Sequence, residues 1–225
     1  MGDRTRSILL LKAADDRYRS ALEAEHSEED RCPVLSVHFA DVLTFEYVNG
    51  DRLEQILLSL DEFSGLLLTS PRSAIAVTQT VQSLASEQAS DVIERLRKLP
   101  VFSVGAATSR ELEPLGVTCR GEESGSAELL AEYLHGTDGA LPPDCETKPI
   151  VFLCGEKRSD VLPGSFHTRG LPLQELVVYR TCPVQELHIP KECGELDWVV
   201  FFSPSGMKVA RELDLPWATI KKAAI

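Results

Sequence analysis

Short apolar runs with β-branched residues alternate along the chain with longer amphipathic or charged segments. This alternation is typical of α/β proteins, in which buried strands of a parallel sheet are each followed by an amphipathic helix. The apolar runs predict strands over Ser7–Leu11, Val34–Phe39, Gly65–Thr69, Val101–Val104, Ile150–Leu153, Glu175–Tyr179 and Trp198–Phe202.

The segments between these runs predict helices, because several of them begin with a polar residue that can cap a helix. The segment 136–148 is rich in Gly, Pro and Asp, and we expect it to form a surface loop. The expected helices cover Asp51–Ser59, Ser73–Ser86, Ala89–Arg97, Ala107–Leu115, Ala127–Leu134, Asp160–Arg169 and Gly206–Glu212.

A strand-to-helix corner made of small residues recurs along the chain, at 69–72, 104–108, 154–155 and 202–206. In a parallel sheet, such corners lie at the carboxyl ends of the strands, where ligands bind. A helix start offers unpaired backbone N–H groups, and small or hydroxyl residues let an anion come close. Any single corner is better explained by helix capping alone. Together the corners favour a carboxylate or phosphate ligand.

Two of these corners also form an internal repeat. The sequence L-L-L-T-S-P-R-S-A at 66–74 parallels V-F-F-S-P-S-G at 200–206, and the first copy continues to a second strand and a Gly corner. By analogy, we expect Ala223–Ile225 to form a strand about to enter a corner. The repeat therefore predicts that the chain stops within a motif.

Composition narrows the class of protein. The chain is 43% hydrophobic and 26% charged, and no apolar stretch approaches the roughly 18 residues that a membrane span requires. The run Ile8–Leu11 is too short for the core of a signal peptide. Six cysteines occur without a C-x-x-C pair or a histidine at zinc-ligand spacing, which favours free thiols in a reducing cytosol. We expect a soluble, cytoplasmic protein that binds neither a membrane nor a metal.

The formal net charge of −12 argues against a nucleic-acid partner, because binding to a phosphate backbone requires clustered Lys and Arg. An anionic ligand would have to be held by local donors. The motifs G-x-G-x-x-G, G-x-x-x-x-G-K-[ST] and G-x-S-x-G are absent from the sequence, so chemistry without a cofactor is favoured. The histidines stand alone in the sequence, and Cys154 has no histidine near it, so a packing role is favoured for this thiol.

Six motifs follow one another along the chain: T-S-P-R at 69–72, V-G-x-A-T at 104–108, G-x-A-E-x-L-A-E-Y at 125–133, F-x-C-G at 152–155, V-Y-x-T at 178–181 and F-F-S-P-S-G at 201–206. As an ordered set they resemble the eukaryotic uroporphyrinogen-III synthases. The resemblance runs from Leu9 to Ile225 and rests on the order and spacing of the motifs. Members of this family continue with G-P-T-T-A-R-A-L and a final helix, so the resemblance also implies a C-terminal truncation.

The resemblance implies a HemD-like fold, in which two flavodoxin-like α/β domains with parallel sheets are joined by a two-stranded connection. Residues 1–33 plus 182–225 would form domain 1, and residues 34–181 would form domain 2. Pro33–Phe39 and Leu176–Cys182 would be the crossing strands, and the substrate would bind between the domains.

The implied activity is that of a lyase without a cofactor. The substrate would be hydroxymethylbilane, a linear polycarboxylate tetrapyrrole, which is cyclised with inversion of ring D to uroporphyrinogen III in heme and tetrapyrrole biosynthesis. We expect a monomer, because interdomain interfaces of this kind tend to be small and mobile. Two alternatives stay open: a catalytically inactive fragment or isoform of this enzyme, and an unrelated flavodoxin-like protein that binds a small molecule.

The resemblance and the corners together nominate site residues. Tyr179 matches the family tyrosine suggested to assist departure of the hydroxyl, and a phenol can donate to a leaving oxygen. Taken alone, Tyr179 also fits a half-buried aromatic residue of a strand. The corners nominate donors that would hold carboxylates or position rings, together with two candidate cations that fit plain surface residues equally well. These residues are Ser70, Gly105, Thr108, Gly155, Ser203 and Ser205 as donors, and Lys157 and Arg158 as cations.

Overall fold

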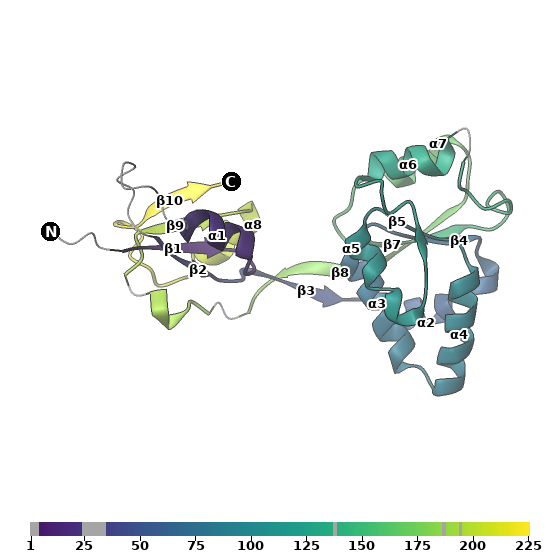
Figure 1. Ribbon diagram of the computed structural model, residues 1–225, viewed down its shortest axis with the longest axis horizontal. Helices are drawn as coiled ribbons and strands as arrows, with labels where there is room; N and C mark the ends of the chain where they lie inside the picture. Colours follow the sequence, from purple (N-terminus) through teal and green to yellow (C-terminus); the bar gives the residue numbers. More distant parts are fainter. Residues whose placement is uncertain (1–4, 24–34, 137–138, 186–187, 194) are drawn as a thin grey trace. The chain divides into compact units, whose positions relative to one another are not determined.

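The structure is a computed structural model that describes residues 5–23, 35–136, 139–185, 188–193 and 195–225. The chain divides into two compact units (Figure 1). Unit 1 comprises Met1–Thr44 with Cys182–Ile225, and unit 2 comprises Phe45–Thr181. The chain passes between the units within β3 (Leu43–Tyr47) and again within β8 (Leu173–Pro183).

Unit 1 is built on a parallel sheet with the strand order β10-β9-β1-β2. Side chains of β1 alternate between two cores, because successive residues of a strand point to opposite faces. Leu9 packs in the core that includes Ala210 of α8, and Leu10 packs in the core that Tyr18 of α1 covers. The elements are β1 (Arg6–Leu11), α1 (Asp16–Glu23), β2 (Leu35–Phe39), η3 (Lys191–Cys193), β9 (Trp198–Phe201), α8 (Pro204–Ala210) and β10 (Lys221–Ala224).

Unit 2 contains a sheet with the order β3-β8-β7-β4-β5-β6, in which the pairs from β8 to β6 are parallel. Its strands besides β3 and β8 are β4 (Gly65–Leu68), β5 (Val101–Ser103), β6 (Cys119–Arg120) and β7 (Ile150–Gly155). Its helices are α2 (Gly50–Leu58), η1 (Leu60–Glu62), α3 (Pro71–Ser83), α4 (Ser86–Lys98), α5 (Ala106–Arg110), η2 (Glu113–Leu115), α6 (Ala127–His135) and α7 (Val161–Thr168).

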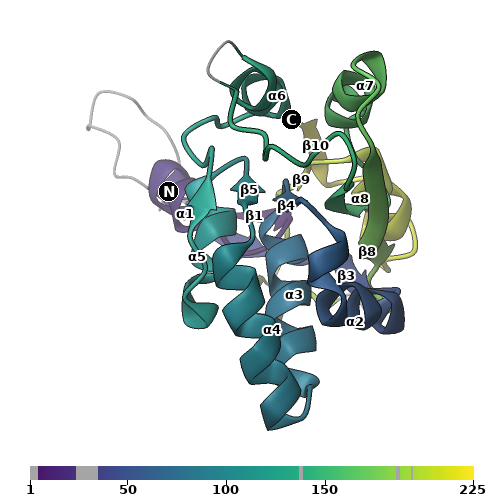
Figure 2. The ribbon, with the colours of Figure 1, turned by 90° about the vertical axis from the view of Figure 1, so that its right-hand side faces the viewer.

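Helices cover both faces of the unit 2 sheet (Figure 2). Leu66 and Leu68 of β4 pack in the core with residues of α2, α3 and α4, which we call the lower core. Leu67 faces the opposite side, where it packs with residues of α6 and α7 in what we call the upper core. Because both faces are buried, the central strands are apolar throughout, as the sequence indicated.

The strands of the two units lie in the same order, but the strand that comes first along the chain holds a different position in that order in each unit. Counted from β7, the unit 2 order β8-β7-β4-β5-β6 is 2-1-3-4-5, which is the flavodoxin-like order. The unit 1 order β2-β1-β9-β10 matches the first four positions of this arrangement, as far as the described residues extend. In this scheme β9 corresponds to β4 and β10 to β5, which confirms the internal repeat and the strand expected near Ala223. The predicted fold class is confirmed.

The first expected domain boundary differs from the structure. Residues 33 and 34 lie outside the described residues, but β2 pairs with β1 in the register Ile8↔Val37 and therefore belongs to unit 1. The crossing strand is instead β3, so the first change of unit falls at Phe45 and not at residue 34. An apolar run identifies a strand but does not reveal which sheet the strand joins.

One α-helix, two strands and the short 3-10 helices η1 and η3 were not predicted. Their sequence signals are weak: helix α1 has no buried residue, strand β6 spans two residues, and β3 is mostly exposed. The other expected strands and helices are confirmed to within a few residues, except that Ala107–Leu115 divides into α5 and η2. Among the described helices, none is both long and apolar enough to cross a membrane.

Candidate functional site

Four of the expected site residues gather at one edge of the unit 2 sheet. Strands β8, β7, β4 and β5 are neighbours and run parallel, so their carboxyl ends lie on the same edge. In this order the edge carries Tyr179, Gly155, Ser70 and Gly105. We call it the corner edge. Segments up to 109 residues apart in sequence thus come together at this edge of the sheet.

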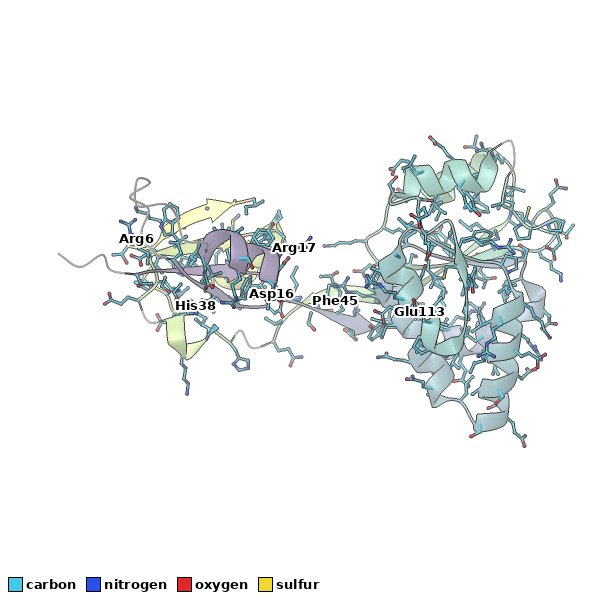
Figure 3. All side chains as sticks on the ribbon, in the orientation of Figure 1. Arg6, Asp16, Arg17, His38, Phe45 and Glu113 are labelled. Carbon is cyan, nitrogen blue, oxygen red and sulfur yellow. The ribbon has the colours of Figure 1, made fainter. Side chains whose placement is uncertain are left out.

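Tyr179 lies on β8 beside Gly155 of β7, with which it is paired in the sheet. Its ring meets the ring of Phe45 edge to face, with centroids 6.2 Å apart and an interplanar angle of 71°. Phe45 comes from β3, where Figure 3 labels it. The Tyr179 hydroxyl has no hydrogen-bond partner among the described residues. It is therefore a phenol free to donate.

Arg72 is a site residue that the sequence analysis did not single out. Its guanidinium carbon lies 3.3 Å from the centroid of the Phe45 ring, a cation–π contact. It forms no ion pair with a carboxylate among the described residues. Burial raises the pKa of Tyr47, while the charge of Arg72 acts to lower it. The only sequence signal was the position of Arg72 in the T-S-P-R motif, because its aromatic partner belongs to a strand that was not predicted.

Ser70 caps helix α3. Its Oγ accepts a hydrogen bond from the backbone N–H of Arg72 at 3.2 Å, and Pro71 occupies the first helical position. Because a serine hydroxyl is both donor and acceptor, the Ser70 proton remains available for another group. The cap thus fixes the hydroxyl at the corner edge next to Arg72.

Gly105 and Thr108 occupy the next corner but differ in accessibility. Gly105 is the N-cap of α5 and adopts an extended conformation. The N–H groups of Ala106 and Ala107 open the helix, where an intrahelical partner is lacking. Thr108 is 3% exposed, and its N–H donates to the Gly105 carbonyl at 2.9 Å. At this corner the accessible donors are therefore backbone groups, whereas the Thr108 side chain packs inside.

The two candidate cations after β7 lie in a loop, and one of them, Arg158, is paired with carboxylates. Helix α7 begins at Val161, so Lys157 and Arg158 lie in the preceding exposed loop and not in the first helical turn. Arg158 forms ion pairs with Glu175 and with Asp160, the latter at 3.2 Å. The hydrogen bond with Glu175 raises the pKa of Arg158. The charge of Arg158 is thus already matched by carboxylates.

Cys154 lies one residue before Gly155 but is closed to solvent. Its side chain is 0% exposed, and its thiol contacts the Leu176 carbonyl at 3.7 Å. Burial raises the pKa of this thiol to about 11. A nucleophilic cysteine requires a thiolate, so the structure favours the packing role expected from the sequence.

Ser203 and Ser205 belong to unit 1, at the corner after β9. The Ser203 Oγ accepts a hydrogen bond from the Gly206 N–H at 3.0 Å and caps α8, as Ser70 caps α3. Ser205 lies in the first turn of α8, and its side chain is outside the described part of the structure. In the described residues, no group of three His, Cys, Asp or Glu side chains is placed to hold a metal ion.

Comparisons with known proteins agree with this geometry. The family model described as uroporphyrinogen-III synthase HemD matches residues 16–213. The uroporphyrinogen-III synthase of Saccharomyces cerevisiae is 29% identical over 216 residues, covering 89% of this chain and 75% of the yeast protein. That of Schizosaccharomyces pombe is 27% identical over 225 residues, covering 96% of this chain and 84% of the relative.

Solved structures share the fold. The uroporphyrinogen-III synthetase of Helicobacter pylori superposes with a TM-score of 0.55 at 14% identity, covering 98% of this chain and 84% of that chain. A mutant uroporphyrinogen III synthase of the extremely thermophilic bacterium Thermus thermophilus gives a TM-score of 0.53 at 16% identity, with the same coverage. The family match spans most of the sequence and includes every residue of the corner edge. This chain therefore belongs to the uroporphyrinogen-III synthase (HemD) family.

Proposed function

We propose that this chain is a uroporphyrinogen-III synthase, a lyase of heme and tetrapyrrole biosynthesis that cyclises hydroxymethylbilane with inversion of ring D. The observation that carries the proposal is the family match over residues 16–213. The corner edge supports it, because a phenol and a cation that forms no ion pair within the described part of the chain both contact the Phe45 ring there. The proposed product is uroporphyrinogen III.

The substrate carries acetate and propionate arms, so its binding requires several separated donors. Arg72 would hold one carboxylate, because a guanidinium donates two parallel hydrogen bonds to it. The Ser70 hydroxyl and the backbone N–H groups after Gly105 would hold others. The net charge of the chain is −12, so these local donors must act against the overall field.

Tyr179 would donate its phenolic proton toward the terminal hydroxyl of the substrate, which leaves as water. Loss of water leaves an electrophilic methylene carbon at the end of the bilane, and the substituted carbon of ring D would bond to it in a spiro intermediate. The bond from that ring carbon to its methylene bridge would then break, and the bridge would bond to the unsubstituted carbon of ring D. The proton lost from that carbon balances the one that Tyr179 donates. A hydroxymethylpyrrole loses water readily. The larger contribution of the protein would therefore be to hold the bilane in the conformation that reacts at the substituted carbon. The site needs no cofactor for this chemistry.

The proposal includes a monomer that acts in the cytosol. Unit 1 and unit 2 each contain their own buried cores, which is compatible with a chain that folds without a partner. Light scattering coupled to size-exclusion chromatography would report the mass in solution. A mass of twice the 24.8 kDa chain would contradict the monomer.

The activity is tested by the isomer formed. Hydroxymethylbilane is supplied with the protein, the products are oxidised, and the uroporphyrin isomers are separated, because spontaneous closure gives isomer I. Isomer III above the level of a heat-denatured sample would support the proposal. Isomer I alone would contradict it. Calorimetric titration with the bilane would then separate an inactive member of the family, which binds the bilane, from a protein for another small molecule.

A further inference from the structure

Tyr179 reaches the corner edge because strand β8 contains an extra residue. Cys154 pairs with Val177 and Gly155 pairs with Tyr179, so Val178 is the unpaired residue of a β-bulge. Side chains of a regular strand alternate between the faces of a sheet. Val177 accordingly packs in the upper core, but Val178 and Tyr179 both pack in the lower core.

The bulge therefore turns Tyr179 onto the face that carries Phe45. In an unbroken strand, the residue after Val178 would point to the opposite face, into the upper core. Bulges often re-aim a side chain next to an active site. The position of the phenol at the corner edge depends on this irregularity.

Gly155 leaves the space that the ring of Tyr179 fills. A Cβ atom at residue 155 would lie 2.6 Å from Cζ, 2.7 Å from Oη and 2.8 Å from Cε2 of Tyr179. Gly155 is not among the glycines with positive φ, so its backbone conformation does not require glycine. The absence of a side chain at residue 155 therefore leaves room for the hydroxyl end of the Tyr179 ring.

We infer that Gly155 is a positioning residue, which together with the bulge at Val178 fixes the place of the Tyr179 hydroxyl. The inference rests on the proposed function. Tyr179 is only partly buried, so its ring can swing aside when a methyl group is added at residue 155. The main consequence of the methyl group is then a displaced hydroxyl, and the fold is retained.

The packing is tested without substrate. The sequence contains four tyrosines, so protein labelled with 3-fluorotyrosine gives four fluorine resonances, and Tyr179→Phe assigns one of them. Gly155→Ala should shift the Tyr179 resonance and leave the other three unchanged. The matched control is Gly164→Ala in α7, where an added Cβ would have nothing within 4 Å. An unchanged Tyr179 resonance in Gly155→Ala would overturn the inference.

The catalytic consequence is tested by the rate of isomer III formation. Gly155→Ala should lower kcat by about tenfold or more and change KM little, because the substrate contacts at Ser70 and Arg72 remain. Gly164→Ala should keep the kcat of the unaltered chain. The double variant Gly155→Ala/Tyr179→Phe should be no slower than Tyr179→Phe alone, because both changes act on one hydroxyl.

Two results would separate the inference from the proposed function. If Tyr179→Phe slows the unaltered chain while Gly155→Ala leaves kcat unchanged, Gly155 does not position the hydroxyl and the inference fails. Independent, multiplying losses in the double variant would overturn it as well. If the unaltered chain forms no isomer III, the proposed function fails, and the fluorine resonances alone decide whether Gly155 places the ring.

Discussion

Among the single residues of the corner edge, Phe45 is the common partner: its ring contacts both Tyr179 and the guanidinium of Arg72. The contact between Arg72 and Phe45 joins the start of α3 to β3 across 27 positions of sequence. A sequence motif could indicate Tyr179. It could not indicate the cation–π pair, because Arg72 and Phe45 meet only in the folded chain.

Replacement of Tyr179 by Phe should lower kcat markedly, by about 100-fold if the phenol acts as a general acid. The hydroxyl is lost while the ring that packs against Phe45 remains. Cys154→Ser should reduce activity far less, because the thiol is buried and closed to a substrate. The measurement is the rate of isomer III formation for both variants. Equal losses in the two variants would remove Tyr179 from its special role.

Substitution of Arg72 by Gln should raise KM by about tenfold or more with a smaller change in kcat, because the cation that holds a carboxylate is removed. Arg95→Gln provides the comparison, since Arg95 is an arginine already paired with Asp61 and Asp91 at the surface. It should leave KM unchanged. An unchanged KM for Arg72→Gln would show that the guanidinium does not hold the substrate.

His135 should make the stability of the protein depend on pH. Burial lowers the pKa of this side chain, and the charge of Arg169 lowers it further. The unfolded chain therefore binds the proton more readily. The contribution of neutral His135 is complete above the unfolded pKa of about 6.5 and is lost as the pH falls through the folded value. Urea midpoints should decrease from about pH 7 to pH 5.

A control tests whether this pH dependence belongs to His135. His135→Leu should flatten the dependence, because the titrating group is gone. His167→Gln should not flatten it, because His167 is exposed on α7. The same slope in His135→Leu and in the unaltered chain would assign the dependence to other groups.

Among the secondary-structure elements, two helices of unit 2 begin with a serine N-cap. Ser70 caps α3 and Ser126 caps α6, each by accepting a hydrogen bond from a backbone N–H in the first turn. Capping signals of this kind were visible in the sequence, and both helices are confirmed. Only their positions relative to the sheet distinguish a cap at the site from an ordinary cap.

Replacement of either serine by Ala should cost about 1 kcal/mol of unfolding free energy, because one orphan N–H loses its partner. Ser70→Ala should also raise KM, whereas Ser126→Ala should leave KM unchanged. Chemical denaturation and the isomer assay measure the two effects on the same samples. If both variants left KM unchanged, Ser70 would be a cap and nothing more.

At the scale of the whole molecule, the chain forms two units with separate cores. Leu9 lies in a core of unit 1 and Leu67 in the upper core of unit 2, and both side chains are 0% exposed. Both tryptophans of the sequence, Trp198 and Trp217, belong to unit 1. Tryptophan fluorescence therefore reports on unit 1, while circular dichroism reports on both units.

Leu67→Ala should destabilise unit 2 by about 2–5 kcal/mol, because it leaves a cavity in a closed core. The change should appear by circular dichroism and leave the tryptophan transition in place. Leu9→Ala should lower the tryptophan transition by a similar free energy. A parallel shift of both signals in both variants would mean that the two units unfold as one.

Most of the strands and helices, the repeat that relates β4 to β9, and the family could all be predicted before the fold was known. Each of these depends on local hydrophobic periodicity or on ordered motifs, and both are properties of the linear sequence. The folded chain was needed to show that β2 joins unit 1, that Arg158 pairs with carboxylates, and that Gly155 makes room for Tyr179. These facts depend on which distant segments pair and in which register, and a bulge of one residue is enough to send a side chain to the other face.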